Sequence, residues 1–232
     1  MTTRQDKEVT KARNIRDNNW KPRLIDNGWA IVECPQSERF ESFVVKLAQL
    51  LGTPVARRNG RTVQRIQPLP QELARPQSLS RSYGLGAIPL HIDTAHLPIP
   101  DRYIVLGCED PGDTPSPTIL LDTHILDLSE TKISYFHSAS FFVKNGRKSF
   151  YSTIRSKERS FFRFDPGCMQ PVSADGENVM NYLHTENHLN SLINIRWEKH
   201  QIAIIDNWRM LHGRGNDQPA DQRRCLIRIS VK

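Results

Sequence analysis

A series of short apolar runs separated by turn residues constrains the fold of this chain more than any other feature. From residue 102 onward, β-branched and aromatic residues cluster in runs of about seven and then give way to polar or glycine-containing turns. The runs are RYIVLGC (102–108), TILLDTHIL (118–126), SASFFVKN (138–145), KSFYSTI (148–154), SFFRFD (160–165), a strand pair within 194–213, and CLIRISVK (225–232). Many short strands of this kind predict a barrel or a jelly roll with flanking helices.

The N-terminal half adds a strand and an amphipathic helix to this pattern. GWAIVECP (28–35) predicts a short strand, and SERFESFVVKLAQLLG (37–52) predicts a helix with an apolar stripe and Ser37 as its N-cap. Residues 53–86 are rich in proline, glycine and arginine, which predicts a long loop system. SADGENVMNYLHTENHLNSL (173–192) predicts a second helix.

Length and charge favour one basic globular domain. A chain of 232 residues fits a single domain, 1–232, of which the polar residues 1–18 are predicted to be flexible. Most of the net charge of +7 lies in residues 1–65. A basic segment can contact nucleic acid, but no aromatic interleaving or known nucleic-acid motif accompanies it here. We therefore expect a solvated basic surface and no nucleic-acid partner.

Membrane and secretory signals are missing from the sequence. No apolar run reaches the length of a membrane span, and the N-terminus has no hydrophobic signal region. The four cysteines (Cys34, Cys108, Cys168 and Cys225) are far apart and form no C-x-x-C motif. Widely spaced cysteines suit reduced thiols, so we expect a cytoplasmic protein with no membrane partner.

Candidate metal ligands are concentrated in HIDTAH (91–96). Residues i and i+2 of a strand point to the same face, so His91 and Asp93 can bind one ion. His96 lies five positions after His91 and precedes two prolines. It is therefore a poor third ligand unless the chain turns sharply at Thr94 and Ala95.

The third ligand must come from elsewhere. His184 and His188 are spaced i, i+4 on a predicted helix, but the intervening H-T-E-N-H differs from H-E-x-x-H and suits a solvated helix face better. His212 follows the buried-looking strand IAIIDNWRML and opens the glycine-rich HGRG. Together with His91 and Asp93 it makes two histidines and one carboxylate, a set typical of non-haem Fe(II). Zinc sites are more often four-coordinate.

Oxygen activation at such a centre needs an electron source, usually 2-oxoglutarate, whose far C5 carboxylate requires a cation. An arginine fork suits this carboxylate best. Downstream of His212, the segment RRCLIRIS supplies Arg224 and Arg228 on one predicted strand face, with Arg223 on the other.

These motifs together resemble the Fe(II)/2-oxoglutarate-dependent dioxygenases of the taurine dioxygenase and clavaminate synthase-like superfamily. The resemblance rests on HIDTAHLPIPDRYIVLGC, PTILLDT, FRFDPGCM, IAIIDNWRMLHGRG and RRCLIRIS, in this order. It implies a mixed α/β, mainly β fold with a double-stranded β-helix (jelly-roll) core and flanking helices. It also implies a chain that uses Fe(II), with 2-oxoglutarate as co-substrate and O2, and that releases succinate and CO2.

The resemblance also implies roles for single residues. His91, Asp93 and His212 would be the iron ligands, with no catalytic residue beyond them. Arg224 and Thr118 would bind the C5 carboxylate of 2-oxoglutarate. Arg228 would lie beside it and contact either the co-substrate or the substrate, and the spacing leaves Arg223, Arg224 and Arg228 partly interchangeable. Relatives that halogenate lack the carboxylate, so Asp93 favours hydroxylation of an unactivated C–H bond, with desaturation and cyclisation left open.

The substrate is less defined. Arg163 and Asp165, which alternate on a predicted strand, are candidate substrate contacts, although a structural Arg–Asp pair explains them equally well. His96 and Tyr83 are further candidates. We expect a small-molecule substrate, an amino acid or a biosynthetic intermediate. The alternatives are a related oxygenase acting on a peptide- or carrier-bound substrate and a non-catalytic jelly-roll binding protein. Nothing in the sequence indicates an oligomeric state.

Overall fold

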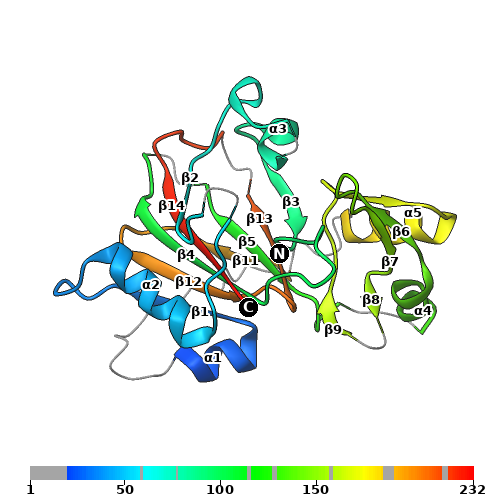
Figure 1. The fold of residues 1–232 in the computed structure, drawn as a ribbon, viewed down its shortest axis with the longest axis horizontal. Coiled ribbons are helices and arrows are strands. Elements are labelled where there is room, and N and C mark those ends of the chain that lie inside the picture. The colour runs from blue at the N-terminus through cyan, green and yellow to red at the C-terminus, as the bar shows by residue number, and fades with distance from the viewer. Residues whose placement is uncertain are drawn as a thin grey trace, which may run out of the picture.

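The computed structural model describes residues 20–57, 60–76, 78–113, 116–126, 130–156, 159–184, 191–215 and 219–232. The described chain is mixed α/β and mainly strands, as predicted (Figure 1). The segment 1–18, predicted to be flexible, lies outside the described residues. Among the helices that the structure describes, none is both long and apolar enough to cross a membrane.

Two antiparallel sheets form the centre of the molecule. The five-stranded sheet has the order β1 (Trp29–Glu33), β12 (Gln201–Asp206), β4 (Tyr103–Asp110), β14 (Cys225–Val231) and β2 (Gln64–Ile66). The four-stranded sheet has the order β11 (Ile193–Ile195), β5 (Thr118–Asp122), β13 (Met210–Arg214) and β3 (Ile88–His91). The runs 102–108 and 225–232 therefore form strands, as their composition predicts, whereas only the first part of the run 118–126 does, because β5 ends at Asp122.

Side chains alternate across the five-stranded sheet and supply two apolar layers. On β4, Val105 joins the cluster beneath the helices, whereas Ile104 and Leu106 join the cluster between the sheets. The cluster between the sheets also includes Trp197 and Leu120. This cluster thus packs the four-stranded sheet against the five-stranded sheet, and it includes Leu120 of β5.

Helices cover the outer face of the five-stranded sheet. They are α1 (Trp20–Asn27) and α2 (Phe40–Leu51), and Val44 and Leu47 of α2 are fully buried against the sheet. The predicted helix 37–52 is confirmed, but the expected cap is wrong. Arg39 occupies the N-cap position and no side chain caps the helix. Helix α1 was not predicted from the sequence.

The remaining elements belong to a side module and to the loop system 53–86. The module carries the small sheets β10 (Met169–Pro171), β6 (Phe141–Val143), β7 (Phe150–Ser152), and β8 (Arg155–Ser156) with β9 (Arg159–Phe162), and the helices α4 (Glu130–Ser138) and α5 (Ala174–His184). In Figure 1 it lies to the right of the central sheets. Residues 53–86 contain β2, the 3-10 helix η2 (Gln71–Leu73) and the short helix α3 (Leu79–Tyr83).

Candidate metal centre

Strand pairing brings the two histidines together. Strand β13 lies between β5 and β3, and His212 is the direct cross-strand partner of His91. The imidazole centroids are 4.5 Å apart. The next residue, Gly213, is needed for this approach, because a Cβ atom there would lie 2.5 Å from the Ile88 carbonyl oxygen.

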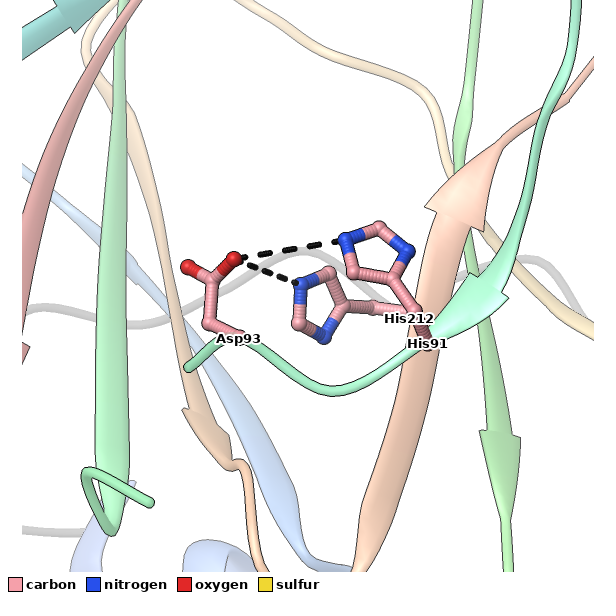
Figure 2. A group of neighbouring side chains, drawn as sticks. All are labelled: His91, Asp93 and His212. Atoms are coloured by element: carbon pink, nitrogen blue, oxygen red, sulfur yellow. Dashed lines mark ion pairs between the residues drawn. The ribbon is translucent and has the colours of Figure 1, made fainter. Parts of the chain in front are cut away.

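The carboxylate reaches the same point from a turn. Strand β3 ends at His91, and the chain turns at Thr94, whose φ of 61° lies in the left-handed region. Asp93 Oδ1 is 4.0 Å from His91 Nε2 and 3.9 Å from His212 Nε2. Figure 2 shows both imidazoles facing this carboxylate. The predicted convergence of His91 and Asp93 is therefore seen, although Asp93 is not part of the strand.

The other histidine candidates that the structure describes do not join this group. Within the part of the chain that the structure describes, His91, Asp93 and His212 form the one cluster of three groups able to hold a metal ion. The chain does turn at Thr94, yet His96 stays outside the cluster, and its carbonyl accepts a hydrogen bond from Asn145 Nδ2. His184 ends α5, and its proposed partner His188 lies outside the described residues.

Hydrogen bonds and charge prepare the three groups for a cation. His91 Nδ1 is 2.8 Å from the Pro89 carbonyl oxygen, and this contact needs the proton on Nδ1, which leaves the Nε2 lone pair toward Asp93. Burial and the neighbouring His212 lower the pKa of His91. Burial would raise the pKa of Asp93, but Arg228 and the two imidazoles hold it well below its usual range. The site thus presents two imidazole rings and an ionised carboxylate.

This donor set fits Fe(II). Two imidazole nitrogens and one carboxylate oxygen on one side of an ion leave its other side open, the arrangement of non-haem iron oxygenases. Arg228 on β14 lies on the far side of the carboxylate, with Nη1 3.1 Å from each oxygen of Asp93. Its guanidinium also contacts Gln64 Oε1.

The two arginines just before the last strand differ in exposure, although neither belongs to β14, which begins at Cys225. Arg223 is exposed and pairs with Asp113 at the surface. Arg224 is 7% exposed, donates from Nη1 to the Ser116 carbonyl, and leaves its buried Nε without a hydrogen-bond partner among the described residues. Burial and the nearby Arg214 lower the pKa of Arg224 to about 10.

The sequence identified Thr118 but not Trp197 and Arg214, which also lie in the buried arginine region around Arg214 and Arg224. Thr118 is buried at the start of β5, and its hydroxyl accepts a hydrogen bond from Trp197 Nε1 at 2.9 Å. Arg214 is the cross-strand partner of Thr118 and donates to the carbonyls of Gly84 and Gly86. Its only signal in the sequence is its place in HGRG, two residues after His212 on the same strand.

The candidate substrate residues occupy different environments. Arg163 follows β9 and is fully buried, and its guanidinium donates to the carbonyls of Ala95, Leu97 and Pro98. It therefore braces a loop, contrary to the substrate contact that we expected.

Asp165 is half-buried and lies close enough to His91 to act on it electrostatically. It accepts hydrogen bonds from the Gly167 amide and the Cys168 thiol. Tyr83 ends α3, the helix of the loop system that Arg214 anchors at Gly84 and Gly86. Asp165, Tyr83 and His96 are thus left as candidate substrate contacts.

Comparisons with known proteins agree with this geometry. Residues 117–230 match a family described as "Taurine catabolism dioxygenase TauD, TfdA family". A solved structure of asparagine oxygenase with Fe(II), hydroxyasparagine and succinate is similar over 93% of this chain and 78% of that chain, at 18% identity and a TM-score of 0.75. The non-haem iron oxygenase OrfP with Fe and alpha-ketoglutaric acid is similar over 94% and 79%, at 18% identity and a TM-score of 0.70. At this identity the likeness establishes a shared fold. No curated protein sequence matches the chain.

Proposed function

Residues 117–230 are a TauD, TfdA family domain, and on this premise we propose that the chain is a non-haem Fe(II)- and 2-oxoglutarate-dependent oxygenase. The observation that carries the proposal is the convergence of His91, Asp93 and His212 on one point. His212 lies inside the matched segment, whereas His91 and Asp93 precede it. Two of the three proposed ligands therefore lie outside the family match and support the function independently of it.

The two central sheets support a jelly-roll core for this oxygenase. They are antiparallel, share one apolar layer, and place the metal cluster on the four-stranded sheet. We propose that the whole chain forms a single oxygenase domain around them. The helices and the side module would then flank the core, as in the expected architecture.

Each polar group near the centre has a proposed task. His91, Asp93 and His212 hold Fe(II), while Arg224 and Thr118 bind the C5 carboxylate of 2-oxoglutarate. Iron with bound 2-oxoglutarate supplies O2 activation, with release of succinate and CO2 and hydroxylation of an unactivated C–H bond. The protein orients these partners and keeps the cation site buried, which limits the access of water.

The substrate proposed is a small amino acid or a related biosynthetic intermediate. Asp165, at the edge of the metal cluster, suits an amino or guanidinium group, because a carboxylate binds such cations through charge-assisted hydrogen bonds. Arg228 suits a substrate or co-substrate carboxylate, and Tyr83 and His96 are further candidate contacts. The solved structures of asparagine oxygenase and OrfP contain hydroxyasparagine and hydroxyarginine, which supports this class of substrate.

Anaerobic spectroscopy tests the function directly. Fe(II) and 2-oxoglutarate are added to the folded protein without O2, and we expect the weak visible charge-transfer band of the chelate. His212→Ala should abolish the band while the protein remains folded by circular dichroism. A folded wild-type protein that gives no band would contradict the oxygenase proposal and favour a non-catalytic binding protein.

Succinate release then tests the substrate class. The protein is assayed with a panel of free amino acids and with the same amino acids tethered to a peptide or carrier. We expect stimulation by a free amino acid, reduced in Asp165→Ala. Stimulation by tethered forms alone would replace the small-molecule proposal with its alternative.

A further inference from the structure

The loop from Asp93 to Asp101 is held by side chains from elsewhere in the chain. Its carbonyl groups accept hydrogen bonds one after another. The donors are Asn207 (to Asp93 and Asp101), Arg163 (to Ala95, Leu97 and Pro98), Asn145 (to His96) and Trp208 (to Pro100). Side chains that immobilise a loop in this way fix the positions of the residues on it. The first residue of this loop is Asp93, the proposed metal-binding carboxylate.

Asn207 is the member of this set that contacts the ligand residue itself. Its Oδ1 accepts the Asp93 amide at 2.8 Å, and its Nδ2 donates to the Asp93 carbonyl at 3.0 Å. The second proton of Nδ2 goes to the Asp101 carbonyl at 2.7 Å. Asn207 itself is fully buried, and its bond to the Asp101 carbonyl is buried, while its two bonds to Asp93 are partly buried. One carboxamide therefore holds both backbone groups of Asp93.

The position of Asn207 links the ligands to one another. It lies in the turn between β12 and β13, five residues before His212, and its own amide donates to the Arg102 carbonyl. Strand β13 then delivers His212 opposite His91. Asn207 thus ties the turn that carries Asp93 to the start of the strand that carries His212.

We propose that Asn207 is a positioning residue for the metal centre, which orients the Asp93 carboxylate toward the two imidazoles before the metal binds. The inference rests on the proposed metal site and goes beyond it. Only a carboxamide offers an acceptor and two donors in this arrangement. An aspartate there would place an oxygen against the Asp93 and Asp101 carbonyls, and a serine is too short to replace all three bonds.

Fe(II) affinity measured under argon tests this inference without turnover. Asn207→Asp and Asn207→Ser are titrated with Fe(II) against a competing chelator, and the charge-transfer band with 2-oxoglutarate is recorded. We expect the Fe(II) Kd to rise by roughly tenfold to 100-fold, as for other groups that orient metal ligands, with a shifted or weakened band. Trp208→Phe is the matched control, because it removes a hydrogen bond to Pro100 of the same loop and leaves Asp93 untouched.

The outcomes separate the inference from the proposed function. If the wild type binds no Fe(II), both fail. If it binds Fe(II) and a folded Asn207 variant keeps the wild-type Kd and band, the positioning role alone is overturned. Equal losses in Trp208→Phe would also overturn it, since loop stability would then explain the effect.

Hydrogen exchange in the wild type covers the case in which neither variant folds. Asn207 presets Asp93 in the metal-free protein, so the Asp93 amide should exchange slowly before any metal is added. Zn(II), a diamagnetic substitute, should then change that rate little. Fast exchange that slows only with Zn(II) would mean that the metal orders Asp93, and would overturn the inference.

Discussion

The metal cluster and the buried arginine region differ in how their charges are matched. In the metal cluster, the Asp93 carboxylate faces two imidazoles and the Arg228 guanidinium. In the arginine region, Arg214 and Arg224 lie near each other, and the hydrogen bonds that they make in the described chain go to backbone carbonyls. Both regions use β13, which carries His212 and Arg214. They also meet at β14, which carries Arg228 and begins one residue after Arg224.

This difference indicates what each region lacks. A buried guanidinium without an anion carries a desolvation cost that its carbonyl partners offset only in part. The arginine region is therefore arranged for an incoming anion, and 2-oxoglutarate would supply one. The metal cluster already contains its anion, Asp93, and is arranged for an incoming cation. The variants below alter one region at a time.

Loss of the carboxylate should have the largest effect. Asp93→Ala leaves Arg228 beside two imidazoles with no anion, so a cation is no longer attracted to the cluster. We expect Fe(II) binding to weaken by more than about 100-fold, beyond the loss typical of groups that only orient a ligand. Anaerobic titration measures this, with Asp165→Ala as the control carboxylate at the cluster edge. An Fe(II) Kd for Asp93→Ala close to the wild-type value would remove the contrast between the regions.

Arg224→Met should change two properties in opposite directions. The Kd for 2-oxoglutarate, measured anaerobically at saturating Fe(II), should rise about 30- to 150-fold, corresponding to roughly 2–3 kcal/mol for a charge-assisted contact. The melting temperature of the ligand-free protein should stay level or rise, since an apolar side chain replaces a buried cation that has no counter-charge among the described residues. Arg223→Ala, at the surface, should change neither. Equal effects of the two variants on 2-oxoglutarate would contradict the assignment of Arg224.

Local sequence patterns were enough to predict some residues of the metal cluster and of the arginine region. Residues that alternate with a period of two predicted the strands, and the H-x-D spacing predicted that His91 and Asp93 converge. Strand alternation is not the reason for that convergence, because Asp93 lies beyond β3, and it does not separate Arg223 from Arg224, because both precede β14. Alternation could not show that β3 ends at His91 or that Thr94 takes a left-handed conformation, which is uncommon for a β-branched residue.

The supporting residues could not be predicted, because their roles depend on distant backbone atoms. Asn207 contacts Asp93, and Arg214 contacts Gly86, each more than a hundred positions away. No short motif encodes such a contact. Arg163 was misplaced because β9 ends at Phe162, so the predicted alternation with Asp165 does not apply there. Its burial against three carbonyls is a property of the folded loop.

The spacing between the backbones of β13 and β3 tests the comparison of the two regions at the metal cluster. Gly213→Ala places a Cβ atom 2.5 Å from the Ile88 carbonyl, so β13 and β3 must separate where His212 faces His91. We expect Fe(II) affinity to fall by about tenfold, comparable to the loss of a ligand-orienting group. Gly215→Ala is the control, since its nearest neighbours are side-chain atoms of Pro117 and Ile119 beyond the histidine pair. A stability loss in both variants, with unchanged Fe(II) affinity, would show that the metal cluster tolerates a wider strand spacing.

The smallest effect is expected from a single hydrogen bond in the arginine region. Trp197 is 3% exposed and donates from Nε1 to the Thr118 hydroxyl, which leaves the hydroxyl proton free to point toward an incoming anion. Trp197→Phe keeps most of the buried aromatic contact and removes this donor. The hydroxyl is then free to rotate, and the 2-oxoglutarate Kd should rise about three- to tenfold, as expected for roughly 1 kcal/mol. Fe(II) affinity should not change, because Trp197 touches none of the three ligands. A loss of Fe(II) affinity as large as the loss of 2-oxoglutarate affinity would mean that the two regions are coupled through the core, and that their charges cannot be treated separately.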